Sequence, residues 1–173
     1  MPTSSVSRPA QATEPIDMHK VFAFECKAGK PLARIPMVIR RKLDVCGVKL
    51  TMRGWASLGQ EEKWLLVRKA CESPEEQSAY RQLLLQFAGV QITAMDPAPD
   101  AADEIALSTS TEVPAQVVLQ CGLHGLPAPC PGRWPRLDAL QRYALVKLSR
   151  PGHHNEHFLP AIEEFDLLEL SKL

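Results

Sequence analysis

The stretch IPMVIRRKLDVCG, residues 35–47, indicates the fold class of this chain. Its apolar side chains share one helical spacing: Ile35, Ile39, Leu43 and Cys46. Steps of three to four residues place them on one face of an α-helix, and Gly47 is a suitable residue to end that helix. The sequence therefore predicts an amphipathic helix that buries this face.

Two further helices are predicted after a turn that contains Trp55. The second covers residues 59–70, GQEEKWLLVRKA, and the third covers residues 73–89, SPEEQSAYRQLLLQFAG. The third helix starts with a capping box and a first-turn proline, formed by Ser73, Pro74 and Glu76. Gly89 is the residue expected to end it.

The pattern of this first half returns later in the chain. Val113-Pro114 follows Ile35-Pro36 by 78 positions (113 minus 35), and Trp134 follows Trp55 by 79 (134 minus 55). Other matches keep the same order: Gly47 with Gly125, Leu58 with Leu137, Trp64 with Tyr143, Tyr80 with Phe158, and Phe87 with Phe165. We therefore expect an all-α fold of internally duplicated three-helix units that pack with pseudo-two-fold symmetry.

The repeat also predicts the domain boundaries. Repeat 1 spans about 34–89 and repeat 2 about 112–167, within one helical domain over residues 21–173. Residues 90–111 have no sustained apolar period and contain Pro97, Pro99 and several acids, which predicts a linker. Residues 1–20 are polar and rich in Ser and Pro, which predicts a disordered N-terminal tail. The prolines of GLPAPCPG, residues 125–132, predict a loop in repeat 2.

The composition predicts a soluble, cytoplasmic protein. With 173 residues and 45% hydrophobic content, the chain can bury one core. We find no apolar run of signal-peptide or membrane-spanning length, so no membrane partner is expected. The five cysteines form no CxxC pair, and in a cytosolic chain we expect them to be reduced and mostly buried.

Charge is segregated along the chain although 20 basic residues balance 20 acidic ones. Residues 27–69 hold eleven Lys and Arg against three acids, a net charge of +8, whereas residues 88–132 hold five acids and no Lys or Arg. This pattern fits either a docking face for an acidic partner or two helices with solvated outer faces. Asp44 is expected to bond Arg34 or Arg40 locally, or to orient a partner contact.

Three stretches resemble the nitrate reductase-associated protein family: FAFEC at 22–26, IPMVIRRKLDVCGVKL at 35–50 with the following Trp55, and LQRYALVKLSRPGHHNEHFLPAIEEF at 140–165. The resemblance covers roughly residues 22–167. It implies an accessory protein of a molybdenum-containing assimilatory nitrate reductase, with no reaction of its own and no catalytic residues to carry over. His153 belongs to the shared SRPGH motif, whereas His154 and His157 depart from the family pattern.

The histidine cluster raises a second possibility. In a helix, His153 and His157 would lie on one face and could hold a divalent metal with further ligands from elsewhere. Pro160 opposes a helix over this segment, and the aligned positions in repeat 1 are Glu75 and Ala79, so the fold does not need ligands there. We predict no metal and no cofactor. A metal- or cofactor-handling role of His153, His154 and His157 stays as an alternative, and the other reading of His153 is a hydrogen bond that fixes the SRPG turn.

Enzyme signatures such as GxSxG and HExxH are absent from the sequence. The sequence therefore predicts a non-catalytic accessory protein that supports maturation, assembly or activity of a nitrate reductase by docking to the reductase or its maturation machinery. A small helical DNA-binding regulator is the other alternative, although aromatic residues are few and not interleaved with the basic ones. The candidate partner-binding residues are Arg40, Arg41, Asp44, Lys147, Arg150 and His153.

Overall fold

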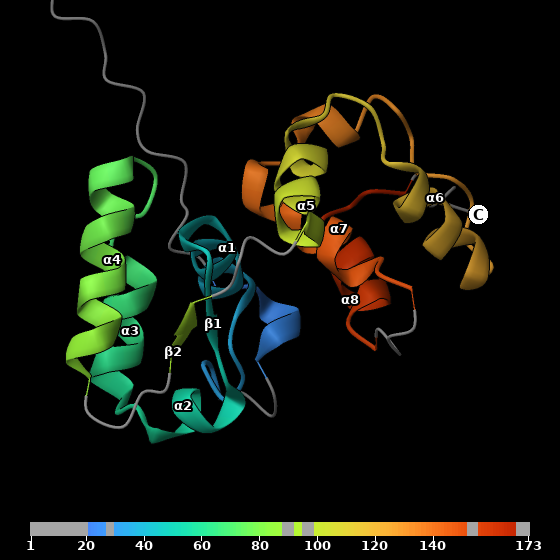
Figure 1. The fold of residues 1–173 in the computed structure, drawn as a ribbon. Coiled ribbons are helices and arrows are strands. Elements are labelled where there is room, and N and C mark those ends of the chain that lie inside the picture. Colours follow the sequence, from blue (N-terminus) through green and yellow to red (C-terminus); the bar gives the residue numbers. More distant parts are fainter. Residues whose placement is uncertain (1–20, 27–29, 88–91, 95–98, 152–155, 169–173) are drawn as a thin grey trace, which may run out of the picture.

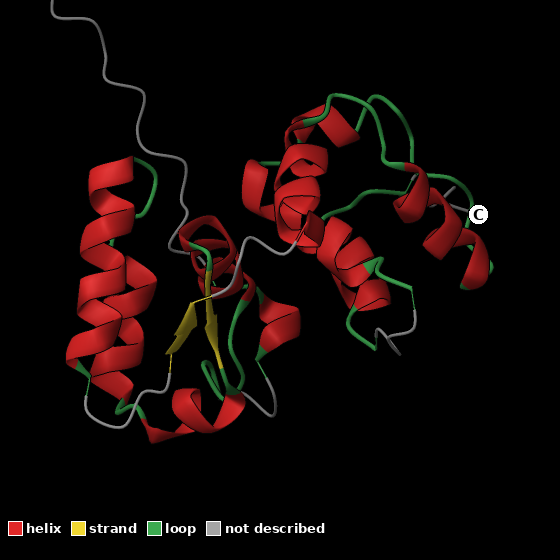
Figure 2. Cartoon of the chain, viewed as in Figure 1, coloured by secondary structure: helices red, strands yellow, loops and turns green. Residues whose placement is uncertain are grey.

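The structure is a computed structural model of the 173-residue chain, and it describes residues 21–26, 30–87, 92–94, 99–151 and 156–168. Over these residues the fold is mostly helical, as predicted, with one short two-stranded ribbon (Figure 2). The predicted tail, residues 1–20, lies outside the described residues.

The first half contains η1 (Ala23–Glu25), α1 (Met37–Cys46), β1 (Val48–Leu50), α2 (Met52–Ser57), α3 (Gln60–Arg68), α4 (Pro74–Gln86) and β2 (Ile92–Ala94). The predicted end of α1 is confirmed, because Gly47 follows it with a φ of 62°, a conformation that favours glycine. The predicted capping box of α4 is also confirmed, since the Ser73 side chain accepts the backbone N–H of Glu76. This helix ends at Gln86, and Gly89 lies outside the described residues.

The ribbon departs from an all-α fold. β1 and β2 pair antiparallel, with Val48 opposite Ala94 and Leu50 opposite Ile92. Val48 and Leu50 are buried and Lys49 is exposed, which is the alternation expected of a strand that covers a core on one face. The segment right after Gly47 thus has the alternation of buried and exposed side chains that an extended strand produces.

The second half contains α5 (Pro99–Thr109), α6 (Ala115–Leu123), η2 (Trp134–Arg136), α7 (Ala139–Leu148) and α8 (Phe158–Glu164). Residues 125–132 are free of helix, as their prolines predicted. The predicted linker, residues 90–111, instead holds β2 and α5. The buried face of α5 carries Ala101, Glu104 and Ser108, so a helical period is present but is not an apolar one.

Helix α1 lies at the centre of the molecule (Figure 1). It contacts α3 and α4 on the side of the first half and α5 and α7 on the side of the second half. Its buried stripe includes Val38, Ile39 and Leu43, which belong to one continuous apolar core. The residues that the sequence predicted as the buried face of α1 thus belong to the core shared by both halves.

Both matched tryptophans are fully buried and make the same kind of hydrogen bond. The indole Nε1 of Trp55 donates to the carbonyl of Leu32, and that of Trp134 donates to the carbonyl of Ser110, each at 3.0 Å. Each acceptor lies three residues before the Ile-Pro or Val-Pro pair that precedes the next helix. The two halves therefore share a local way of pinning the chain that enters a helix.

The start of the described chain is bound to its last helix. The Glu164 carboxylate in α8 accepts the backbone N–H groups of Ala23 and Phe24, both at 2.9 Å. The Phe22 ring packs edge-on against Phe165 with centroids 4.8 Å apart. Segments about 140 residues apart in sequence thereby lie side by side, and they enclose a hollow on one side of α1.

Candidate functional site

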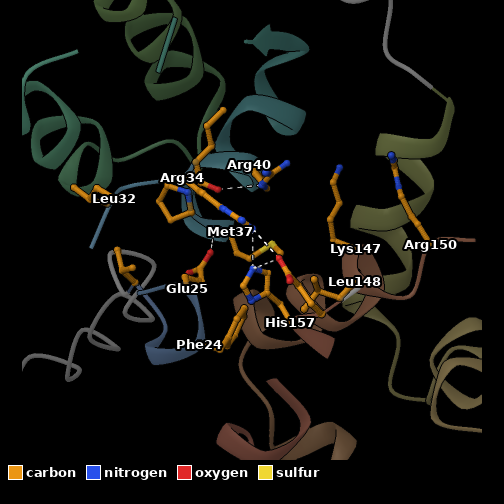
Figure 3. A pocket seen from close by; sticks show the side chains of 14 residues that line it. Phe24, Glu25, Leu32, Arg34, Met37, Arg40, Lys147, Leu148, Arg150 and His157 are labelled. Atoms are coloured by element: carbon orange, nitrogen blue, oxygen red, sulfur yellow. Dashed lines mark hydrogen bonds and ion pairs between the residues drawn. The ribbon is translucent and has the colours of Figure 1, made fainter. Parts of the chain in front are cut away.

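A pocket of about 430 Å³ lies between η1, the start of α1, the end of α7 and the start of α8 (Figure 3). This volume is within the range of small-ligand sites. The residues that line it are Val21, Phe24, Glu25, Leu32, Arg34, Ile35, Pro36, Met37, Arg40, Lys147, Leu148, Arg150, Glu156 and His157. The pocket combines an apolar wall with four side chains that carry a positive charge.

Glu25 is held inside this pocket by the backbone. Its carboxylate accepts the N–H of Met37, the first residue of α1, at 2.6 Å and the N–H of Phe22 at 3.1 Å. Burial raises the pKa of Glu25 to about 7, although these two N–H groups and the charge of Arg40 act in the opposite direction. Glu25 thus caps α1 and adds a titratable group near neutral pH to the pocket.

Arg40 brings a positive charge to the pocket. Its Nε donates to the carbonyl of Ile35 at 3.0 Å, which fixes the guanidinium over the pocket (Figure 3). Among the described residues, no carboxylate forms an ion pair with Arg40. The guanidinium Nη groups are donors in a planar fork, a geometry that suits a carboxylate or another oxyanion.

Arg34 lies at the outer edge of the pocket and is already partnered. Its Nη1 lies 3.2 Å from Glu156 Oε1 and 3.2 Å from His157 Nε2. Because a guanidinium has donors only, His157 Nε2 accepts and the ring proton lies on Nδ1. The Arg34 and Glu156 side chains are 46% and 69% exposed, so this pair is open to solvent and is easily exchanged for a ligand.

Lys147 and Arg150 stand between this pocket and a second hollow of about 260 Å³. Lys147 Nζ lies 2.6 Å from Asp44 Oδ2 and 2.8 Å from Glu104 Oε2, and Arg150 also pairs with Glu104. The three carboxylate and ammonium side chains are at most 15% exposed. Much of this positive charge therefore serves to join α1, α5 and α7.

Asp44 takes part in this cluster rather than in a local bond. Its Oδ2 also accepts the hydroxyl of Tyr143 at 2.5 Å. Burial raises the pKa of Tyr143 well above its ordinary value, and the nearby Asp44 charge adds to the effect. Asp44 thus bonds to Tyr143 and Lys147 of α7 instead of to Arg34 or Arg40. The spacing of residues in the sequence does not indicate these contacts between helices.

The structure brings Arg40, Lys147 and Arg150 together but separates Arg41 from them. Arg41 pairs with Glu72 at 3.0 Å on the side of α1 that faces the α3–α4 turn. His153 and His154 lie outside the described residues, and His157 lines the pocket as the residue before α8. Within the described part of the chain, no three His, Cys, Asp or Glu side chains are grouped as metal ligands.

Sequence reasoning missed Glu25, Glu104 and Arg34 as residues of this region. Glu25 lies in the short FAFEC stretch, which was noted only because the stretch resembles a known family. Glu104 lies on a helix that shows no apolar period. Their proximity arises from long-range packing, which a single sequence does not reveal.

None of the helices in the described residues has the length and apolar character needed to cross a membrane. The arrangement of the pocket suits binding, because its apolar wall and the Arg40 guanidinium, which no carboxylate of the described residues pairs with, can hold an acidic group with an apolar neighbour.

The chain matches a family model described as conserved nitrate reductase-associated protein over residues 21–165. Comparisons with curated proteins and with solved structures returned no significant match. The matched range covers η1 through α8, and so includes every segment that lines the pocket. The chain belongs to the conserved nitrate reductase-associated protein family.

Proposed function

We propose that this chain is a non-catalytic, cytoplasmic accessory protein that supports maturation, assembly or activity of an assimilatory nitrate reductase by docking to the reductase or its maturation machinery. Membership of the family supports an association with nitrate reductase. The docking mechanism is our inference from the geometry of the pocket.

The observation that carries the proposal is the Arg40 guanidinium beside an apolar wall, with no ion-pair partner among the residues that the structure describes. Leu32, Ile35 and Met37 contribute to that wall, and Arg34 lies at its rim. A partner segment with one acidic side chain next to an apolar one would satisfy both halves of the pocket. Aromatic or aliphatic anchors and desolvated Arg–carboxylate pairs are the contacts that dominate protein interfaces.

Co-purification with nitrate reductase tests the proposal. The double variant Arg34→Gln with Arg40→Gln removes two positive charges from the pocket. The matched control, Arg53→Gln with Arg68→Gln, removes two exposed charges that do not line it. We expect the pocket variant to capture at least tenfold less reductase than the wild type, while the control captures the same amount at an equal melting temperature.

Different results would contradict the accessory role and the pocket as its docking site. If the wild type captures no reductase or maturation factor from nitrate-grown cells, the accessory role by docking is wrong. If the wild type captures it and both double variants do so equally, the partner binds elsewhere on the protein.

We also infer that the two halves arose by duplication and are related by pseudo-two-fold symmetry. The equivalent hydrogen bonds of Trp55 and Trp134 support this inference. So do Gly47, the C-cap of α1, and Gly125, which follows the C-cap of α6, since their φ values are 62° and 70°. A docking pocket between the halves would then be a property of the pair and not of either unit alone.

A further inference from the structure

Two cysteines meet beneath the turn that joins α3 to α4. Cys46 is the last residue of α1, Cys71 lies in the turn, and their Sγ atoms are 3.2 Å apart. Each residue is 1% exposed. A disulfide requires an S–S distance of about 2.05 Å, so closing this pair calls for a small side-chain movement.

A buried ammonium lies next to the pair. Lys42 Nζ donates to the backbone carbonyls of Leu66, Val67 and Lys69 at 3.3, 2.6 and 2.7 Å. These carbonyls belong to the end of α3, which leads directly into the turn that holds Cys71. The Cys71 Sγ in turn lies 3.9 Å from the Lys42 carbonyl. The charge of Lys42 lowers the pKa of both thiols, and so favours a thiolate at this site.

The two thiols have unlike environments. A hydrogen bond from Cys71 lowers the pKa of Cys46, burial opposes this, and the charges of Arg81 and Lys42 also lower it. The hydrogen bond to Cys46 and burial both raise the pKa of Cys71. Arg81 also lies beside Cys46, since its Nε donates to the Cys46 carbonyl at 2.6 Å. Because the thiolate is the reactive form and this cation is close to Cys46, Cys46 is suited to attack and Cys71 to resolve the product.

We propose that Cys46 and Cys71 are a redox-active dithiol that a peroxide converts to an intramolecular disulfide. The Cys46 sulfur attacks a peroxide oxygen, the O–O bond breaks, and the departing oxygen takes the Cys46 proton to leave as water or an alcohol. The Cys71 sulfur then attacks the resulting sulfenic acid, and hydroxide leaves as water with the Cys71 proton. The peroxide gains the two electrons that the two thiols lose.

Access to the sulfur atoms depends on the turn that covers them. Lys69, Ala70 and Glu72 in this turn are exposed, so a local opening of a few residues admits a molecule as small as hydrogen peroxide. Once formed, the disulfide would fasten the end of α1 to the turn between α3 and α4. Closing the 25-position span between the cysteines should raise the unfolding temperature by several degrees.

Peptide mapping tests the proposal directly. Purified, reduced protein is treated with equimolar hydrogen peroxide, alkylated after unfolding and digested with trypsin. Trypsin releases Cys46 within residues 43–49 and Cys71 within residues 70–81, so their disulfide joins two peptides that are otherwise separate. We expect this linked pair as the main product, reversal by dithiothreitol, and a melting temperature about 5 °C or more above that of the reduced form.

Single substitutions assign the roles and provide the control. Cys71→Ser should accumulate a dimedone-reactive sulfenic acid at Cys46, and Cys46→Ser should react with peroxide at least tenfold more slowly at Cys71. Cys26→Ser, which removes a half-buried cysteine elsewhere, should form the linked peptides at the wild-type rate. Recovery of both peptides in alkylated form while Cys26 or Cys130 is oxidised would overturn the proposal.

Discussion

A single carboxyl group, that of Glu25, connects the stability of the fold to pH. The folded protein holds the Glu25 proton up to about pH 7, whereas an unperturbed Glu releases it near pH 4.5. Between these values the unfolded chain binds fewer protons than the folded one, so the free energy of unfolding falls as pH rises. Above about pH 7 both states have lost the proton and this effect is complete.

Glu25→Gln should remove this pH response. From pH 4.5 to 7 the wild type should lose up to about 3 kcal/mol of unfolding free energy relative to the variant, since each pH unit is worth about 1.4 kcal/mol. Urea unfolding at several pH values measures the difference. Glu163→Gln, an exposed carboxylate on α8, is the control and should keep the wild-type slope. Equal slopes for wild type and Glu25→Gln would contradict the assignment.

Single residues also show where sequence reasoning stops. The consecutive cations Arg40, Arg41 and Lys42 cannot all face one ligand on a helix, and of the three only Arg40 lines the pocket. Arg41 pairs with Glu72, and Lys42 is buried and donates to the end of α3. Three consecutive cations on a helix diverge by about 100° each, so their surroundings depend on what packs on each side. That packing is not encoded in the spacing itself.

At the scale of elements, α5 is held by charge as well as by apolar contact. Glu104 is 4% exposed and faces Lys147 and Arg150 on the α7 side. A buried carboxylate between two cations accounts for the lack of an apolar period in this helix. It also explains why residues 99–109 looked like a linker, whereas the Ser73 cap and the Gly47 end made α4 and α1 predictable.

Loss of the Glu104 carboxylate in Glu104→Gln should therefore lower the unfolding free energy far more than loss of a carboxylate from an exposed ion pair. The change keeps the side-chain shape but leaves Arg150 without this carboxylate in a mostly buried site, at a cost of about 3 kcal/mol. Glu156→Gln removes the exposed partner of Arg34 and should cost less than about 1 kcal/mol. Guanidinium unfolding of both variants makes the comparison, and similar losses would show that the cluster contributes little.

At the scale of the whole molecule, the two buried tryptophans test whether the halves are equivalent. Trp55→Phe and Trp134→Phe each remove one indole donor, to the buried carbonyl of Leu32 and to the half-buried carbonyl of Ser110 respectively. The Ser110 carbonyl also accepts a hydrogen bond from Arg142 Nη1 at 3.2 Å. We therefore expect Trp55→Phe to lower the unfolding free energy by about 2 kcal/mol and Trp134→Phe to lower it by less. Trp64→Phe, at a half-buried position, should cost less. A larger loss for Trp134→Phe than for Trp55→Phe would contradict this expectation.

The overall architecture was only partly predictable from the sequence. The matched residues Trp55 and Trp134 suggested two similar halves, and in the structure both tryptophans are buried and donate to a carbonyl ahead of a helix. The pocket could not be predicted, since Glu25 and His157 meet only when the first and last described segments pack together. Such contacts depend on chain topology, and a single sequence gives no direct measure of it.

The bond between Glu164 and the backbone of Ala23 and Phe24 has a consequence for the order in which the chain folds. This contact joins segments 141 and 140 positions apart, and it holds together two walls of the pocket. Contacts between such distant segments carry a high loop-closure entropy and form later than local helices. The pocket is therefore expected to close only after α1, α3 and α4 have packed together.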